Sequence, residues 1–358
     1  MDVAPILGLD QFRLHLEELQ QNQEVVPDAT LIDDISIQLT DYNTPPLLPW
    51  MLPALANVLR STQHDAGALF QITVKLTKSL DFTTCLGLAD EETMLTMLDS
   101  PVDGANLLAL HIIHKAANDP NDASILAERP VVFERLVRRW LQAPSTRVAS
   151  HAEQVLGDLL EVDCSIPIVN GSSLPRQHQV VTPPMRRRHG EVGHDELWNI
   201  FFSNQVLSLI KTTCGQSEND ARNLSDITIA QGRVLRLLPR LASFNLHAVS
   251  DTSHAQVFPL PDAVAEAVGC GLLQWATLGM IDQTDELMER TLVDFFEQLV
   301  LNMRDHTRRA GDQTILKKLV RTTTQTDPRI MSALKSLPQN VEEEDEERTR
   351  VFIEQLLD

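Results

Sequence analysis

The sequence is poor in aromatic residues and in positive charge. Aromatic side chains make up 4% of the 358 residues, with a single tyrosine, so leucine, valine, isoleucine and alanine must supply most of the core. A core of this kind favours packed helices over sheets. Thirty Lys and Arg against 50 Asp and Glu give a formal net charge of −20. This acidity repels phosphate and disfavours nonspecific binding to nucleic acid or to an anionic membrane.

The sequence also has few cysteines, no basic stretch at its start and no long unbroken apolar run. The four cysteines have no zinc-ligand or CxxC spacing, which predicts a reducing, intracellular environment. The first twelve residues contain two aspartates and no basic residue, unlike a signal peptide. The longest uncharged stretch, 42–59, is short and broken by four prolines, so it is not expected to span a bilayer. We expect a soluble protein in the cytoplasm.

Motifs of catalysis are missing as well. The sequence has no GxxxxGK[ST], no GxSxG and no GxGxxG after a strand. His111 and His114 share a helix face, but no further metal ligand lies nearby in sequence, so packing roles are favoured over a metal site. Cys164 has acidic neighbours that raise a thiol pKa, which argues against a nucleophile. We therefore predict no enzyme activity, no catalytic or metal-binding residue, no cofactor and no small-molecule substrate.

Apolar residues recur at helical spacing along nearly the whole chain, and alternating strand patterns are nearly absent. The expected helices are 6–20, 28–39, 49–60, 66–79, 91–98, 102–117, 131–142, 146–160, 196–211, 226–244, 261–278, 285–303, 313–323, 328–337 and 342–357. Residues 166–193 interrupt the pattern with prolines, glycines and arginines, which predicts a flexible basic loop. The expected organisation is an N-terminal helical-repeat region over 1–165, this loop, and a C-terminal helical-repeat region over 194–358.

The number of helices and their short connections favour a repeat architecture. The pair 131–142 and 146–160 recurs at about 40 residues, the period of HEAT and armadillo repeats. A single bundle stays open as an alternative, but one core rarely organises so many helices. We predict an all-α chain built as an α-solenoid of HEAT/armadillo-like repeats.

Two basic clusters oppose the overall charge. Arg233, Arg236 and Arg240 follow i, i+3, i+7 along a helix that Pro239 can kink, and Arg138 and Arg139 lie off the apolar stripe of another helix. Each cluster can pair with acidic neighbours inside the protein. Alternatively, each can line a concave surface and bind carboxylates of a protein partner. These five arginines are the predicted partner-binding residues.

Two runs of charged residues can also be interpreted in more than one way. The arginines at 186–188 form a weak nuclear-import or docking signal, which leaves the nucleus open as a second location. The acidic run 342–347 stands where a terminal helix begins, and negative charge there is favourable whether or not the run also docks a partner.

Three segments resemble a known family: RPVVFERLVRRWLQAPSTRVASHAEQVLGDLLEVDC (129–164), ELWNIFFSNQVLS (196–208) and AQGRVLRLLPRLA (230–242). They are similar to fungal proteasome base-assembly chaperones related to the 26S proteasome non-ATPase regulatory subunit 5. In those proteins a helix pair ending in a VLGDLL-like sequence precedes a variable loop and a W-x-x-x-F segment. The family's fungal member also bears the name of a DNA mismatch repair protein.

This resemblance implies a curved helical-repeat protein without catalytic activity. It would hold the C-terminal domain of an ATPase subunit while the proteasome regulatory particle is assembled, and then leave. The alternative is a generic armadillo or HEAT scaffold for another complex, including a role in mismatch repair through protein partners. Direct contact with DNA is disfavoured by the charge of −20.

Overall fold

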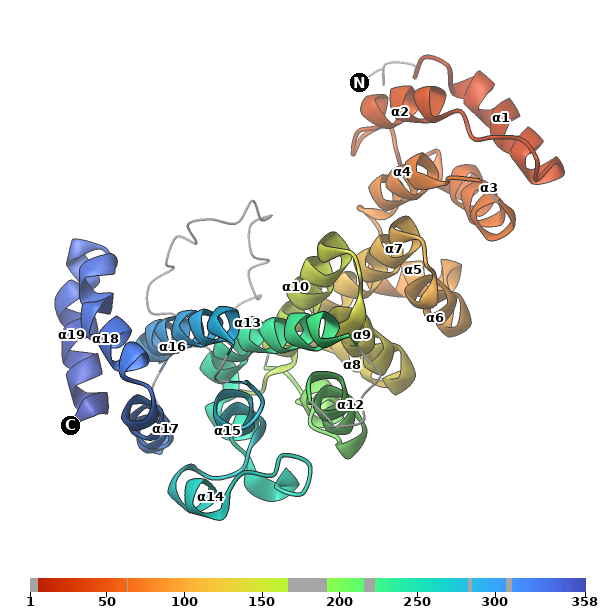
Figure 1. The fold of residues 1–358 in the computed structure, drawn as a ribbon. Coiled ribbons are helices and arrows are strands. Elements are labelled where there is room, and N and C mark those ends of the chain that lie inside the picture. The colour runs from red at the N-terminus through yellow and green to blue at the C-terminus, as the bar shows by residue number, and fades with distance from the viewer. Residues whose placement is uncertain (1–5, 63, 167–191, 216–222, 283–284, 307–310) are drawn as a thin grey trace. The chain divides into compact units, whose positions relative to one another are not determined.

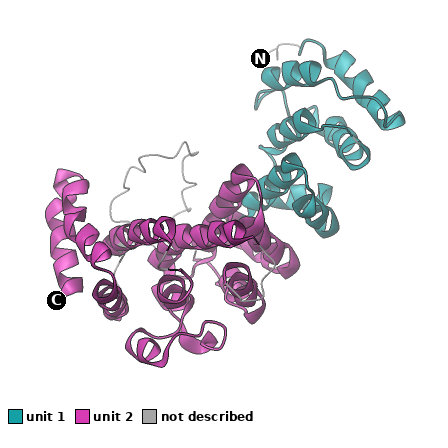
Figure 2. Cartoon of the chain, in the orientation of Figure 1, with its two compact units in different colours: residues 1–116 teal, residues 117–358 magenta. Residues whose placement is uncertain are grey.

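The computed structural model describes residues 6–62, 64–166, 192–215, 223–282, 285–306 and 311–358. Within these ranges the chain forms nineteen α-helices, three short 3₁₀ helices and no strand, so it is all-α as predicted (Figure 1). Contacts divide it into two compact units, residues 1–116 and residues 117–358 (Figure 2). The predicted boundary loop, 166–193, lies almost entirely outside the described residues. The predicted three-part organisation therefore stays a prediction.

Unit 1 contains seven α-helices. They are α1 (Leu9–Gln21), α2 (Ala29–Gln38), α3 (Leu48–Ser61), α4 (Gly67–Thr77), α5 (Phe82–Leu88), α6 (Glu91–Asp99) and α7 (Asp103–His114). α1 packs on α2 and α3, and α4 contacts α2, α3 and α7. α5 and α6 both pack on α7. Each helix thus buries its apolar stripe between neighbours that are close in sequence.

Unit 2 contains the remaining twelve α-helices. They are α8 (Pro120–Ala127), α9 (Pro130–Gln142), α10 (Thr146–Asp163), α11 (Glu196–Phe201), α12 (Asn204–Cys214), α13 (Leu224–Val249), α14 (Asp262–Val268), α15 (Leu272–Leu278), α16 (Glu286–His306), α17 (Asp312–Thr326), α18 (Pro328–Ser336) and α19 (Glu343–Leu357). The two longest helices, α13 and α16, pack on each other. α13 also contacts α9, α10, α12 and α15, and α16 contacts α18 and α19. α13 is therefore the central helix of this unit.

Local sequence signals explain where many helices begin. Aspartate side chains at the N-caps of α2, α5, α6, α8 and α18 accept hydrogen bonds from backbone N–H groups of the first turn. Proline stands in the first turn of α8, α9 and α18, where its missing N–H removes no helical bond. Short polar caps and N-terminal prolines thus divide the chain into helices of ordinary length.

Two predicted helices are wrong because each is in fact a pair. The expected helix over 196–211 breaks at Ser203, whose side chain accepts a hydrogen bond from Val206 N and starts α12. The expected helix over 261–278 breaks at Gly269, which has φ +89° and ends α14. Both breaks use residues suited to helix ends. α5 and α8 were also not predicted, since seven or eight residues give little periodicity.

Within α13, Asn245 has non-helical backbone angles, while Pro239 lies inside the helix. The expected kink at Pro239 is therefore not where the helix is interrupted. Among the described helices, none combines the length and the apolar character needed to cross a membrane.

Candidate functional site

Arg233, the first member of the predicted arginine stripe, lies inside unit 2. Arg233 is 5% exposed. Its guanidinium donates hydrogen bonds to three backbone carbonyls at the end of α9. Nη1 lies 3.1 Å from Trp140 O and 2.8 Å from Leu141 O, and Nη2 lies 2.8 Å from Ala143 O. Helices leave their last carbonyls without helical partners, so Arg233 satisfies α9 at its C-terminus. Burial lowers the pKa of this guanidinium below its ordinary value, but arginine keeps its charge in proteins.

Arg236 and Arg240 pair with carboxylates of α10. Arg236 Nε lies 3.2 Å from Glu153 Oε2, and Arg240 Nη2 lies 2.5 Å from Asp158 Oδ1 and 2.6 Å from Glu161 Oε2. Burial acts to lower the pKa of Arg240, but the two carboxylates outweigh it and raise that pKa. Two guanidiniums on α13 thus meet three carboxylates on α10 in the same order along both helices.

A glycine makes room for this pairing. A Cβ atom at Gly157 would lie 2.3 Å from Arg240 Nη1 and 2.9 Å from its Cζ. The guanidinium is held by carboxylates on the same helix, so it cannot easily move aside. Gly157 therefore lets Arg240 lie directly against the backbone of α10.

The arginine stripe thus lies at the interface of α13 with α9 and α10. This is the alternative in which the arginines pair with groups inside the protein. Arg233 keeps almost no surface for a partner, while the Arg236 side chain is 58% exposed. On α9, Arg138 is 42% exposed and lies 3.5 Å from Glu134, one turn earlier. Arg139 is partly buried. Arg138 and Arg236 thus both keep much of their side-chain surface accessible.

Asp163, the last residue of α10, joins the two sides of the predicted loop. Its side chain is fully buried and accepts hydrogen bonds from the backbone N–H groups of Glu196, Leu197 and Trp198, at 3.3, 2.7 and 3.1 Å. These groups form the first turn of α11, where an anionic acceptor is favourable. Trp198 Nε1 also donates to Leu160 O at 2.7 Å. The W-x-x-x-F segment is thereby fixed to the end of α10.

Backbone contacts strengthen this junction. Asp195 N donates to Asp163 O at 2.8 Å, and Ser165 N donates to Asp195 Oδ1 at 2.7 Å. Gly193 lies so close that a Cβ there would be 2.1 Å from Asp163 O. The chain therefore returns to within hydrogen-bond distance of the point where it leaves α10.

Asp163 makes stability depend on pH. Burial raises the pKa of Asp163 from 3.8 to about 6, although the three N–H donors act to lower it, and Asp195 adds to the rise. The folded state then binds the proton more tightly than the unfolded state. Stability from this group is complete below pH 3.8 and is lost as pH rises through about 6. We expect the free energy of unfolding of wild type, relative to Asp163→Asn, to fall by about 2 kcal/mol from pH 4 to pH 7.

Urea unfolding at several pH values, followed by tryptophan fluorescence, measures this difference. Asp226→Asn is the control, since it removes an exposed carboxylate in the first turn of α13 that does not contact Asp163. Identical pH slopes for wild type and Asp163→Asn would contradict the assignment.

The remaining sequence candidates also have structural positions. Cys164 is buried, and its Sγ donates to Phe244 O at 3.7 Å. His111 and His114 lie in α7, and among the described residues no group of three or more His, Cys, Asp or Glu is arranged to hold a metal ion. The arginine run at 186–188 lies outside the described residues.

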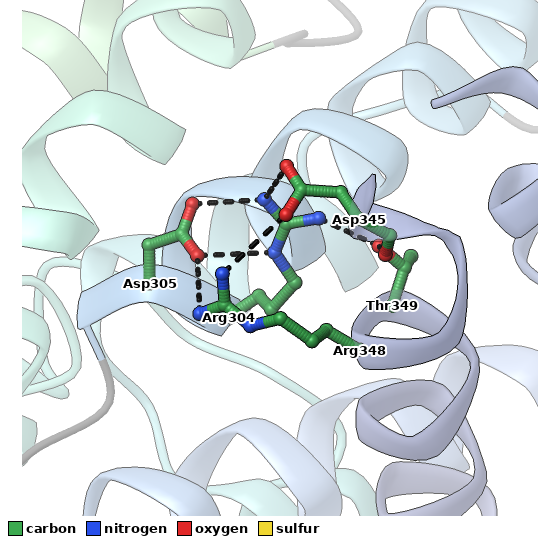
Figure 3. Close-up of polar contacts among 5 residues, drawn as sticks. All are labelled: Arg304, Asp305, Asp345, Arg348 and Thr349. Atoms are coloured by element: carbon green, nitrogen blue, oxygen red, sulfur yellow. Dashed lines mark hydrogen bonds and ion pairs between the residues drawn. The ribbon is translucent and has the colours of Figure 1, made fainter. Parts of the chain in front are cut away.

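The acidic run begins α19 and is partly paired within unit 2. Arg304 of α16, whose side chain is 5% exposed, lies between Asp305 and Asp345 (Figure 3). Its Nη2 is 3.0 Å from Asp305 and 2.9 Å from Asp345, and its Nη1 donates to Thr349 Oγ1 at 2.6 Å. Arg348 adds a weaker contact to both carboxylates. This cluster fastens α19 to α16.

No family model matches this chain, and no curated protein matches its sequence. The membership predicted from the three segments 129–164, 196–208 and 230–242 therefore stays a prediction.

Sequence reasoning missed Asp163 and the carboxylates of α10. A signal for the latter exists: Glu153, Asp158 and Glu161 follow the same order as the guanidiniums of α13. Comparing the two helices would have favoured intramolecular pairing. No local pattern marks Asp163, because its three donors lie more than thirty residues away.

Proposed function

We propose that this protein is a noncatalytic assembly chaperone built as an α-solenoid of HEAT/armadillo-like helix pairs. It binds the C-terminal domain of a proteasomal regulatory-particle ATPase subunit during base assembly and shields one face of that subunit from premature partners. It acts in the cytoplasm, and the nucleus is a second location. The proposal involves no direct contact with nucleic acid or membrane.

One observation supports this proposal most. The three segments that carry the family resemblance lie apart in sequence, yet they fold into helices that pack together. Residues 129–164 form α9 and α10, residues 196–208 contain α11 and begin α12, and residues 230–242 form the middle of α13. α9 and α10 contact each other, and both contact α11 and α13. A resemblance confined to one packed framework is what a shared fold would produce, since framework residues depend on one another.

The exposed guanidiniums give this proposal a partner-facing surface. Arg138 and Arg236 keep much of their surface despite pairing with Glu134 and Glu153. The glutamate side chains of these pairs are mostly covered, at 21% and 20% exposed, so each glutamate keeps its arginine. A guanidinium has five N–H donors, so each arginine can hold its glutamate and still donate to a carboxylate of a partner.

Affinity purification from cell extract at physiological salt, read by mass spectrometry, tests the proposal. We expect recovery of regulatory-particle ATPase subunits without the mature core particle. We expect the double variant Arg138→Gln, Arg236→Gln to recover about tenfold less of the ATPase, a loss of about 1.4 kcal/mol. The control is Arg290→Gln, another exposed arginine paired with a glutamate one turn away.

A generic scaffold for another complex, including one acting in mismatch repair through protein partners, is the alternative. Recovery of such a complex, with the ATPases absent, would contradict the proteasomal assignment and support this alternative. Recovery of the ATPases at equal levels by wild type and the double variant would instead refute the role of the two arginines.

A further inference from the structure

Unit 1 contains a groove of about 690 Å³ bounded by α3, α4, α6 and α7. Buried side chains of α3, α4 and α7 line it, and their exposed fractions are 3 to 9%: Leu52, Phe70, Thr73, Thr77, Leu108 and Ile112. On the other sides of α7, Ala109 and Ile113 are fully buried and do not line it. The volume is within the range of protein ligand sites.

The groove offers methyl groups and few free polar atoms. Thr73 Oγ1 donates to Leu69 O at 2.7 Å, Thr77 Oγ1 to Thr73 O at 2.9 Å and Thr96 Oγ1 to Glu92 O at 2.9 Å. Each hydroxyl proton is thus used within its own helix. Among the described lining residues, none has a buried side-chain N or O atom that lacks a hydrogen bond. The interior therefore suits an apolar guest more than a polar small molecule.

Apolar surface continues out of the groove at its mouth. Val102 is 45% exposed, and Leu59 and Met97 are partly exposed. Along α3 the lining positions Leu52, Ala56 and Leu59 follow i, i+4, i+7, a length of about 10 Å at the helical rise. The same length separates the apolar anchors i, i+4 and i+7 of an amphipathic helix bound in a groove.

The charges around the mouth favour a basic guest. Two carboxylates, Asp65 and Glu92, are exposed there, together with the guanidinium of Arg60. His64 Nε2 is within hydrogen-bond distance, 3.0 Å, of Glu24 O. Arg60 also lies within electrostatic reach of Asp90, a further carboxylate that caps α6. Carboxylates thus outnumber cations, and complementary charge on a partner steers and orients binding.

We propose that this groove binds an amphipathic α-helix of a partner protein. Apolar residues of that helix at i, i+4 and i+7 fill the groove, and Lys or Arg on its flanks face Asp65 and Glu92. This site lies within unit 1 and does not depend on the proteasomal assignment.

A labelled synthetic peptide of about four helical turns tests the site by fluorescence anisotropy with the full chain. The probe carries leucines at i, i+4 and i+7 and lysines on its flanks. We expect it to bind at least about tenfold more tightly than two comparison peptides, a difference of about 1.4 kcal/mol. One has the same composition with the leucines moved off a common face, and the other has glutamates in place of the lysines.

Two pairs of variants locate the binding. Thr96→Trp places a large side chain in the groove, whereas Thr212→Trp alters an exposed threonine with the same bond to its own helix, to Ser208 O at 2.8 Å. Glu92→Arg reverses a charge at the mouth, whereas Glu91→Arg lies in the same turn of α6 and does not line the groove. We expect Thr96→Trp and Glu92→Arg each to weaken binding about tenfold, and the two controls to leave it unchanged.

Circular dichroism confirms that each variant is folded. Equal binding of the scrambled peptide, or binding that Thr96→Trp leaves unchanged, would overturn the proposal. So would a dodecylammonium ion that binds in the groove while the lysine-flanked peptide does not. If the peptide does not bind but the ATPase subunits are recovered, the groove proposal fails and the proposed function is still supported. If the peptide binds but the ATPase subunits are not recovered, the proposed function fails and the groove proposal is still supported.

Discussion

Replacing Arg233 with alanine should lower the free energy of unfolding of unit 2 by about 4 kcal/mol. Its guanidinium satisfies the carbonyls of Trp140, Leu141 and Ala143, and a buried acceptor that loses its donor costs about 1–3 kcal/mol. The substitution also leaves a cavity where the stem was packed. Arg233→Lys should cost about half as much, because one ammonium cannot reach all three carbonyls with good geometry.

Urea unfolding followed by tryptophan fluorescence measures this loss. Three of the four tryptophans, at 140, 198 and 275, are buried in unit 2, so the signal reports that unit. Arg236→Ala is the matched control on the same helix face. It should cost about 1–2 kcal/mol, since the Arg236 side chain is 58% exposed but its loss leaves the mostly buried Glu153 without this donor. A loss at Arg233 no larger than at Arg236 would show that the carbonyls find other donors.

Replacing Arg304 with alanine should lower the free energy of unfolding by about 3 kcal/mol and release α19. The change leaves Asp305 and Asp345 facing each other with little water, and breaking a buried pair from one side is strongly destabilising. We expect backbone amides of α19 to exchange hydrogen faster, while those of α9 and α10 keep their protection. Hydrogen exchange read by mass spectrometry distinguishes the two regions.

Two companion variants test the cause. Arg348→Ala removes the exposed arginine of the same cluster and should cost less than about 1 kcal/mol. Asp345→Asn in the Arg304→Ala background should recover part of the stability, since it removes one of the two carboxylates that have lost the buried guanidinium. If Asp345→Asn lowers stability further in that background, the loss at Arg304 comes from packing and not from charge.

Helices with a long apolar stripe could be predicted from the sequence. The residues Phe133, Leu136, Val137, Trp140 and Leu141 are all buried in α9, and the expected bounds 131–142 match the observed helix within one residue. Such prediction works because one stripe decides both the helix and the side that it buries. Breaks set by a single capping residue, as at Ser203, leave the apolar periodicity intact on both sides and so were missed.

The burial of the arginine stripe could not be predicted from the sequence. The spacing of Arg233, Arg236 and Arg240 correctly places them on one side of a helix, but it gives no information on what covers that side. α13 is packed by α16 and by α9 and α10, so it is buried on more than its apolar face. Arg233 is covered because α9 happens to end beside it, more than ninety residues earlier in the chain. That position depends on tertiary packing, which helical periodicity does not contain.

The contact between Gly157 and Arg240 also bears on how this sequence can change. A glycine inside a helix costs about 1 kcal/mol relative to alanine. α10 keeps Gly157 at this cost because the Arg240 side chain of α13 leaves no room for a Cβ atom there. An alanine becomes favourable at position 157 only after position 240 has lost its long side chain. The two substitutions thus have to occur in a fixed order, and the pair limits evolutionary drift in both helices.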